Sequence, residues 1–158
     1  MILQAVKPRA GLRVVDCTAG LGTDALILAY FGCDVTLIER SRVIAILLDD
    51  AIKRAMCHPN FSDVAARLHL ICGEARSIIG SFQDTDVVYL DPMFPIKSKR
   101  AAVGREAQVL QAFASPDSLR DESLLTWALD SAYRRVVVKR PIKAPPLAGP
   151  PPTATVKG

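Results

Sequence analysis

The sequence predicts one α/β domain in which a mostly parallel sheet is covered by helices on both faces. Short β-branched runs alternate along the chain with segments of helical periodicity, as in βαβ units. The chain has 158 residues, 50% of them apolar, which suits one domain with one core. Four of the five β-branched runs end at or next to a carboxylate, a pattern expected where strand ends share one ligand crevice.

Five apolar runs are expected to form the strands of this sheet. Parallel strands are buried on both faces, so they read as continuous apolar runs without alternation. The runs, each with the polar residue that comes after it, are 14–15 with Asp16, 35–38 with Glu39, 68–72 with Glu74, 87–90 with Asp91, and 136–138 with Lys139. Since ligands of open α/β sheets bind outside the carboxyl ends of the strands, these polar residues are expected to line one crevice.

Two helices are expected between the first three strands. The first covers Asp24 to Tyr30, and the second runs from a cap at Ser41 to about Met56. The apolar residues of the second helix recur at helical spacing and are expected to face the sheet. They are Ile44, Leu47, Leu48, Ala51 and Ala55.

A third helix and a tail are expected in the last third of the chain. Ser115 and Pro116 have the order of an N-cap and a proline at the first helical position. The residues that this helix is expected to bury are Leu119, Leu124, Trp127, Ala128 and Leu129. Six of the last 18 residues are proline, so no regular element is expected there. The chain therefore divides into residues 1–140 and an extended, proline-rich tail of the same domain, residues 141–158.

Composition and charge limit the partners of the chain. Twenty Lys and Arg against 16 Asp and Glu give a net charge of +4 and an isoelectric point of about 9.0, which favours a polyanionic partner. The longest apolar run covers only residues 25–31, whereas a membrane-spanning helix needs roughly 18–20 residues. The first nine residues lack the regions and the cleavage site of a signal peptide. A cytoplasmic protein without membrane contact is therefore expected.

The cysteines and histidines are too scattered to predict a metal site. Cys17, Cys33, Cys57 and Cys72 lie in apolar segments without CxxC spacing, so all four are expected to be buried reduced thiols. A nucleophilic role for Cys17 is the alternative, because Cys17 lies near a glycine turn. Such a thiol needs an activating neighbour, and the sequence around Cys17 offers none.

A strand that runs into a glycine turn and then a helix occupies residues 14–24. Gly20 and Gly22 can adopt unusual dihedral angles and let a ligand approach the backbone, and the helix start offers N–H groups. The third glycine of a dinucleotide fingerprint is absent, and Asp16 and Asp24 would repel a phosphate. Both acids would attract a sulfonium with an α-amino group, so the turn favours S-adenosylmethionine over NAD. A turn that serves packing alone is the alternative.

The second and third strand ends suit the remaining parts of such a cofactor. Glu39 ends the second strand, where a carboxylate can accept hydrogen bonds from both ribose hydroxyls. Arg40 follows it and either contacts the ligand or pairs with an acid. Glu74 and Ala75 follow the third strand, where the adenine ring would lie. Glu74 either contacts the adenine amino group or is solvated, and both interpretations stay open.

Residues 87–95 combine a strand with an acid, a proline and an aromatic residue. The carboxylate of Asp91 and the carbonyl of Pro92 can accept N–H bonds from a planar amine while the ring of Phe94 stacks on its face. The lone pair of a nucleobase amine is delocalised, so its alignment with an electrophilic methyl group is expected to matter more than a strong base. Asp91 would stabilise the developing positive charge. The alternative is that Asp91 and Pro92 only end the strand.

Basic residues follow the fourth and fifth strands, namely Lys97, Lys99, Arg100, Lys139 and Arg140. Charge runs of this kind usually form a solvated face of a protein. Because these residues stand at the same edge of the predicted sheet as Phe94, we expect them to contact the phosphate backbone of a nucleic acid.

Four ordered motifs carry a resemblance to a known family: residues 16–24, 37–40, 89–95 and 136–141. Together they resemble the bacterial small-subunit ribosomal RNA guanine-N2 methyltransferases of the J type, over nearly the whole chain. The resemblance implies a Rossmann-like class I methyltransferase fold of seven strands, with S-adenosylmethionine as the methyl donor. It implies that the acceptor is the exocyclic N2 of a guanosine in 16S rRNA, alone or within the 30S subunit.

The resemblance also implies which residues contact the cofactor: Thr23, Asp24, Glu39, Arg40, Glu74, Ala75 and Asp91. Direct transfer to a guanine splayed or flipped from its helix would need neither a metal nor a covalent intermediate. Members of the family carry a further N-terminal region and a final strand hairpin, so a chain truncated at both ends is expected. Residues 1–140 would then be the S-adenosylmethionine-binding methyltransferase domain.

Three other functions are compatible with the motifs. The acid-Pro-x-aromatic motif also suits methylation of DNA or of a protein amide. A second alternative is a catalytically incomplete fragment that binds S-adenosylmethionine without methylating, because segments that hold the substrate are missing. An NAD-dependent oxidoreductase is least favoured, since the third glycine is absent and Asp24 lies beside the expected phosphate.

Overall fold

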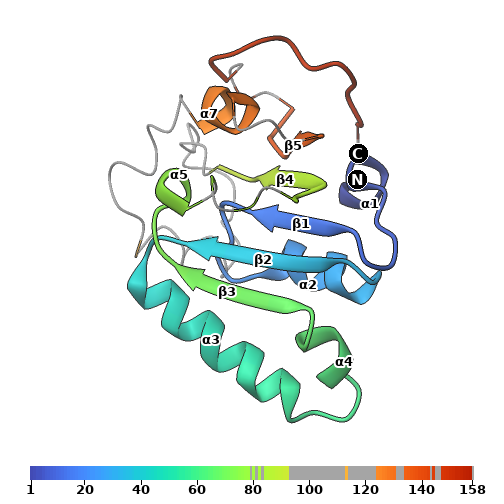
Figure 1. Cartoon of the computed structure of the whole chain (residues 1–158), viewed down its shortest axis with the longest axis vertical. Helices are drawn as coiled ribbons and strands as arrows, with labels where there is room; N and C mark the ends of the chain where they lie inside the picture. The colour runs from blue at the N-terminus through green and yellow to red at the C-terminus, as the bar shows by residue number, and fades with distance from the viewer. Residues whose placement is uncertain are drawn as a thin grey trace, which may run out of the picture.

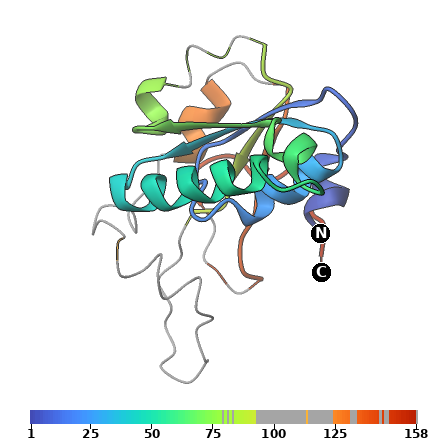
Figure 2. The ribbon, with the colours of Figure 1, turned by 90° about the horizontal axis from the view of Figure 1, so that it is seen from below.

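The computed structural model describes residues 1–78, 80, 82, 84–92, 113, 124–130, 134–142, 144 and 147–157. In these residues, five parallel strands form one sheet in the order β3-β2-β1-β4-β5. The strands are β1 (Arg13–Asp16), β2 (Asp34–Glu39), β3 (Leu68–Cys72), β4 (Val87–Leu90) and β5 (Val136–Val138). Helices cover both faces of the sheet (Figure 1, Figure 2), so the predicted α/β fold is confirmed.

The strand order reverses between β1 and β4. The chain builds β1, β2 and β3 outward in one direction and then returns to place β4 on the other side of β1. Asp16, the last residue of β1, is the register partner of Tyr89 in β4, and Cys17 N–H donates to the carbonyl of Tyr89 at 3.0 Å. Open α/β sheets bind ligands outside the carboxyl ends of their strands at such a reversal. The switch point between β1 and β4 is therefore where a ligand crevice is expected.

One face of the sheet is covered by four helices: α1 (Ile2–Val6), α2 (Thr23–Tyr30), α3 (Arg42–Met56) and α4 (Ser62–Ala65). Figure 2 shows α1, α2 and α3 below the sheet. They pack in one core cluster with sheet residues that include Val14, Val35 and Leu37. The sequence predicts α2 and α3. It does not predict α1 and α4, because helices of five and four residues are too short to show a helical period.

The opposite face carries α5 (Ala75–Ile78) and α7 (Leu124–Asp130), which lie above the sheet in Figure 2. Leu124 and Ala128 are buried in a second core cluster, as predicted, and Trp127 packs against it. Leu129 is 42% exposed, so its predicted burial is wrong. One residue advances an α-helix by about 100°, which turns Leu129 away from the stripe that Leu124 and Ala128 form.

The cap of α3 is confirmed, and its buried stripe follows the predicted pattern with one error. Ser41 Oγ accepts a hydrogen bond from Ile44 N–H at 3.5 Å. Leu47 is 46% exposed, so its predicted burial is wrong. Ala45 is buried instead, which centres the stripe on the other side of Ile44 and leaves Leu47 at its edge. The predicted positions that are buried or partly buried are Ile44, Leu48, Ala51 and Ala55.

Two of the four cysteines are exposed, so the predicted burial of all four is wrong. Cys17 and Cys33 lie in the core, whereas Cys57 and Cys72 are exposed. Cys57 directly follows α3, and Cys72 ends β3, which stands at the edge of the sheet. Apolar neighbours in the sequence therefore do not bury a residue at a helix end or on an edge strand.

The described residues after Pro141 contain no helix or strand, as the proline-rich composition predicts. This tail runs back past α7 and ends beside the N-terminus (Figure 1, Figure 2). Thr126 Oγ1 donates to the carbonyl of Ala148 at 3.4 Å, which ties the tail to α7. The predicted start of this helix at Ser115 and Pro116 lies outside the described residues, as does Leu119.

Candidate functional site

The glycine turn joins β1 to α2 in the predicted strand-turn-helix arrangement. Gly20 and Gly22 have φ angles of 55° and 78°, in the left-handed region that favours glycine. Gly22 directly precedes α2 as its N-cap. A Cβ atom on Gly22 would lie 2.7 Å from Cδ1 of Leu48. Both the backbone angle and the packing therefore favour glycine at position 22.

Replacing Gly22 by alanine is expected to lower the free energy of unfolding by about 1–3 kcal/mol, because alanine is strained in the left-handed region and Leu48 must shift. Gly11→Ala is the matched control, since Gly11 has a φ of 72° and an added Cβ there meets nothing within 4 Å. Chemical denaturation measures both losses. Equal losses at the two positions would mean that crowding of Leu48 adds nothing.

Glu39 connects the end of β2 to the glycine turn. Its Oε2 accepts a hydrogen bond from Gly20 N–H at 2.9 Å, and its Oε1 accepts one from Ser41 N–H at 2.7 Å. The carboxylate therefore orders the turn in addition to any ligand contact. Each carboxylate oxygen has a second acceptor position, so the predicted hydrogen bonds from ribose hydroxyls are compatible with this arrangement.

Arg40 and Glu74 meet across the ends of β2 and β3. Nη1 of Arg40 lies 3.9 Å from Oε2 of Glu74, so Arg40 pairs with an acid, as one of the two sequence interpretations has it. Gly73 N–H donates to the carbonyl of Glu39 at 2.9 Å and holds the two strand ends together. Ala75 is buried as the first residue of α5. The residues predicted to contact ribose and adenine thus lie along one stretch of the carboxyl edge.

Four side chains meet at the switch point, and we call them the Lys139 cluster: Asp24, Tyr89, Asp91 and Lys139. Nζ of Lys139 donates to Oδ2 of Asp24 at 2.6 Å and lies 3.0 Å from Oδ2 of Asp91. The hydroxyl of Tyr89 donates to the same oxygen of Asp24 at 2.6 Å. The cluster thus holds an ammonium group between two carboxylates that come from the start of α2 and the end of β4.

The two donors of the Lys139 cluster are held in their protonated forms. Burial alone lowers the pKa of Lys139, but the hydrogen bonds to Asp24 and Asp91 outweigh it, and the pKa lies above its ordinary value. Burial, together with the hydrogen bond to Asp24, raises the pKa of Tyr89 well above its ordinary range. Both groups therefore act as donors at neutral pH.

Asp16 lies beneath the rim of the site, where only 2% of its surface is exposed. Its Oδ1 accepts hydrogen bonds from Thr18 N–H at 3.0 Å and from the Thr18 hydroxyl at 3.3 Å. Burial raises the pKa of Asp16 to about 7, and the nearby carboxylates of Asp24 and Asp91 add to this effect. The carboxyl group of Asp16 therefore keeps its proton to a higher pH than an exposed acid does, whereas Asp24 and Asp91 are the carboxylates that contact Lys139.

Thr18 and Tyr89 belong to the site although the sequence does not single them out. Thr18 Oγ1 accepts a hydrogen bond from Asp91 N–H at 2.7 Å, which fixes the backbone of Asp91 against the glycine turn. Tyr89 is buried, and its hydroxyl reaches Asp24 from the neighbouring strand. Both contacts join residues far apart in the chain, so a local motif cannot show them.

The structure describes only some of the other predicted site residues. Pro92 is buried directly after Asp91, and the guanidinium of the exposed Arg140 donates to the carbonyl of Ala144. Burial raises the pKa of Cys17 far above its ordinary value, which disfavours the nucleophilic alternative. The predicted residues outside the described part of the chain are Phe94, Lys97, Lys99 and Arg100.

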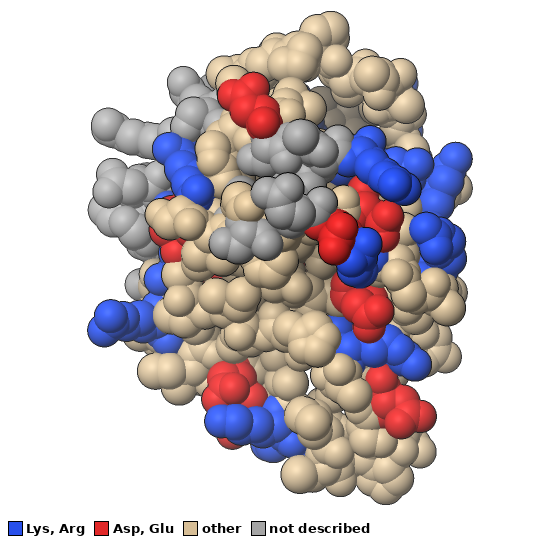
Figure 3. Space-filling view, viewed as in Figure 1, with Lys and Arg blue, Asp and Glu red and all other residues tan. Residues whose placement is uncertain are grey.

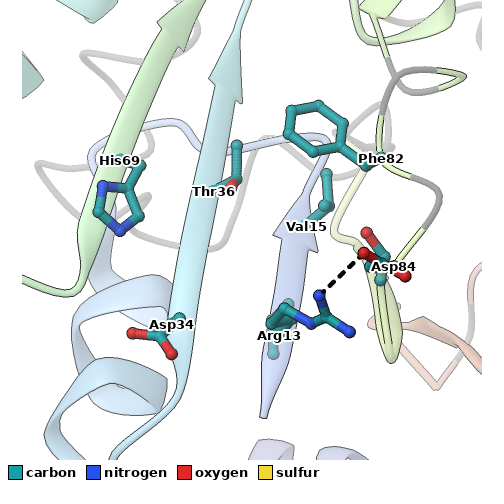
Figure 4. A pocket seen from close by; sticks show the side chains of 9 residues that line it. Arg13, Val15, Asp34, Thr36, His69, Phe82 and Asp84 are labelled. Atoms are coloured by element: carbon teal, nitrogen blue, oxygen red, sulfur yellow. Dashed lines mark ion pairs between the residues drawn. The ribbon is translucent and has the colours of Figure 1, made fainter. Parts of the chain in front are cut away.

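A hollow of about 490 Å³ lies at the other, amino end of the strands (Figure 4). Arg13 and Asp84 pair at this hollow, with Nη1 3.3 Å from Oδ2, and His69 and Phe82 also line it. Its lining contains none of the predicted site residues. We therefore place the candidate site at the carboxyl edge of the sheet and not in this hollow.

Three further observations concern the predicted partners. On the face shown in Figure 3, basic and acidic side chains interleave, and the basic ones do not gather into one patch. Within the described ranges, no helix is both long and apolar enough to cross a membrane. Among the residues that the structure describes, no group of three or more His, Cys, Asp or Glu side chains is placed to hold a metal ion.

Comparison with known proteins relates the whole chain to one family. The family model described as "Putative SAM-dependent methyltransferase" matches residues 1–158. A crystal structure of a SAM-dependent methyltransferase from Neisseria gonorrhoeae matches with a TM-score of 0.73 and 36% identity, covering 97% of this chain and 60% of that one. The fold and the family model therefore agree.

Curated relatives carry the name Ribosomal RNA small subunit methyltransferase J. The relative from Halorhodospira halophila is 49% identical over 148 residues, which cover 92% of this chain and 55% of the relative. The relative from Pseudomonas aeruginosa is 43% identical over 162 residues, which cover 100% of this chain and 62% of the relative. The chain thus spans somewhat more than half the length of these relatives.

Proposed function

The chain belongs to the family of SAM-dependent methyltransferases, and from this premise we propose that it transfers a methyl group from S-adenosylmethionine to the exocyclic N2 of a guanosine in 16S rRNA. The names of its relatives support the rRNA substrate. The observation that carries the proposal is the Lys139 cluster, in which two carboxylates at the switch point hold an ammonium group. A small-subunit rRNA substrate would place the protein in the cytoplasm.

The site suits the charge and shape of S-adenosylmethionine. The cofactor supplies an electrophilic methyl group on a sulfonium, and it carries an α-ammonium group as well. The contacts of Lys139 show that this pair of carboxylates can bind a cation, because its Nζ lies 2.6 Å from Asp24 and 3.0 Å from Asp91. We assign the backbone at Gly20, Gly22 and Thr23 to close approach of the cofactor. The ribose side is assigned to Glu39 and Arg40, the adenine side to Glu74 and Ala75, and the methionine side to Asp24 and Asp91.

The target amine is assigned to the segment after β4. Asp91 and the carbonyl of Pro92 would accept its N–H bonds, and Phe94 would stack on the base. The bond from Asp91 N–H to Thr18 Oγ1 supports this role, because it fixes the backbone that carries the carboxylate. A guanine amine is a weak nucleophile, so rate enhancement would come mainly from alignment and from the negative charge of Asp91.

The rRNA assignment is tested by mass spectrometry of nucleosides from 16S rRNA. A strain without the gene should lose one N2-methylguanosine, and a plasmid with the wild-type gene should restore it. A plasmid encoding Asp91→Ala should not restore it. An unchanged content of N2-methylguanosine would refute the rRNA assignment, and methylation found only in DNA or in a protein amide would favour those substrates.

Changing Lys99 and Arg100 to alanine is expected to weaken RNA binding more at low salt than at high salt. Basic residues that neutralise phosphates release counterions, so each lost contact reduces the slope of log K against log salt concentration by about 0.7–0.9. Binding of 16S rRNA by the double variant, titrated over a range of salt concentrations, measures this slope. A slope equal to that of the wild type would exclude these residues from the RNA contact.

A further inference from the structure

The side chain of Lys139 is held within the site, unlike a side chain that only extends into solvent toward RNA. Its Nζ is bound by carboxylates from two other elements, Asp24 and Asp91, while 47% of the side chain remains exposed. Its backbone is fixed as well, because Lys139 N–H donates to the carbonyl of Leu90 at 2.8 Å. Lys139 is therefore anchored inside the site and still reachable by a ligand.

The Lys139 cluster places negative and positive groups next to each other, about as close together as the two charged groups of an amino acid. An ammonium group has three N–H donors, and the two carboxylates take two of them. The methionine part of the cofactor carries an α-ammonium and an α-carboxylate on one carbon. Acceptors and a cationic donor side by side favour recognition of such a zwitterion through charge-assisted hydrogen bonds, and the cluster contains both.

We propose that Lys139 binds the α-carboxylate of the methionine part of S-adenosylmethionine, while Asp24 and Asp91 accept its α-ammonium. This inference rests on the proposed function, since it assigns a role within the same cofactor site. The raised pKa of Lys139 supports it, because the lysine is kept cationic at neutral pH. Lys139 is thus a cofactor-positioning residue, and the RNA contact predicted for it becomes the rival interpretation.

The charges of the cluster favour binding of the α-carboxylate by Lys139 over a role in which Lys139 only competes with the α-ammonium of the cofactor for Asp24 and Asp91. Two carboxylates and one ammonium give Asp24, Asp91 and Lys139 a combined charge of −1, and S-adenosylmethionine carries a charge of +1. A lysine that only occupied the place of the α-ammonium would have to leave when the cofactor binds. A lysine that pairs with the α-carboxylate can keep its bond to one of its two carboxylates.

The test compares two ligands by titration calorimetry: S-adenosylhomocysteine and its decarboxylated analogue, which keeps the amine but lacks the carboxylate. Wild type is expected to bind S-adenosylhomocysteine about 10- to 100-fold more tightly than the analogue. Lys139→Met should remove most of this difference by weakening S-adenosylhomocysteine, and Lys139→Arg should restore part of it. The difference between the two affinities reports on the α-carboxylate alone. Loss of the Lys139 charge also affects binding of the amine, but it does so equally for both ligands.

Lys53→Met is the matched control, because Lys53 is an exposed lysine of α3 that also pairs with a carboxylate, at 2.6 Å from Asp49. It should leave the difference between the two ligands at the wild-type value. Melting temperatures show whether each variant is folded. If Lys139→Met does not fold, Lys139→Arg still tests the role, because it should lower the difference between the ligands below the wild-type value.

Three results would overturn the role of Lys139. The wild type would bind both ligands equally, or Lys139→Met would bind S-adenosylhomocysteine more tightly, as a competing cation predicts. In the third case Lys139→Met would keep the ligand difference of the wild type, and a loss of affinity for 16S rRNA would then favour the rival interpretation. Failure of S-adenosylhomocysteine to bind the wild type would instead refute the proposed cofactor itself.

Discussion

Replacing Asp91 by alanine is expected to reduce the rate of methyl transfer by about 10²- to 10³-fold, the loss that follows removal of one preorganised electrostatic group. Asp91 is well positioned for such a role, because Thr18 fixes its backbone and Lys139 holds its carboxylate. The affinity for S-adenosylhomocysteine should fall much less, since Asp24 remains to bind the cation. Single-turnover assays on small ribosomal subunits and calorimetry measure the two effects separately.

The control for Asp91→Ala lies at the other end of the same strand. Asp84→Ala removes an acid that precedes β4 at its amino end and pairs with Arg13 at 3.3 Å. This change should leave the transfer rate within about twofold of wild type, because Asp84 lies at the end of the strand opposite the site. The variant should also stay folded, because the exposed pair contributes little to stability. A rate for Asp91→Ala within the same twofold range would show that Asp91 neither orients the amine nor stabilises its charge.

The sheet could be predicted from the sequence because each strand is a continuous apolar run that ends at a polar residue. The run 87–90 is buried throughout and the run 35–38 at all positions but Thr36, so each can be recognised from its apolar sequence alone. Errors arose where burial depends on tertiary position. Leu47 and Leu129 are apolar residues of helices, and their exposure depends on how each helix is rotated against the sheet.

The site could be predicted only as far as its residues lie at the ends of strands. The turn at Gly20 and the acids Glu39 and Asp91 meet at the carboxyl edge, as parallel strands require. The contacts among them are not local: Lys139 and Asp24 are 115 positions apart, and Tyr89 and Asp24 are 65 apart. No spacing rule within a motif predicts such pairs, so the sequence assigns Lys139 to RNA on its charge and its place at the edge of the sheet.

The buried carboxyl group of Asp16 is expected to make the stability of the protein depend on pH. Burial raises the pKa of Asp16 from 3.8 to about 7, although the hydrogen bonds from Thr18 oppose this shift. Between these two pH values the folded chain keeps a proton that the unfolded chain has lost. The contribution of Asp16 to the free energy of unfolding therefore falls as the pH rises from about 4 to about 7, and it changes little above that.

Asp16→Asn should remove this dependence, because the amide does not titrate and its oxygen can still accept the hydrogen bond from Thr18 N–H. Near pH 4 the variant and the wild type should have similar free energies of unfolding. Near pH 8 the variant should be more stable by up to a few kcal/mol, since each unit of pKa shift corresponds to about 1.4 kcal/mol. Urea denaturation at several pH values from 4 to 8 measures the difference.

Asp50→Asn is the matched control, because Asp50 is an exposed acid of α3 that pairs with Arg54 at 2.8 Å. Its difference from wild type should stay small at every pH. A wild-type pH dependence that persists unchanged in Asp16→Asn would show that Asp16 is not the titrating group.

The same titration affects the site, because Asp16 adds negative charge beneath Asp24 and Asp91 as the pH rises through 7. The affinity of the wild type for S-adenosylmethionine should therefore increase over this interval, and Asp16→Asn should lose that increase.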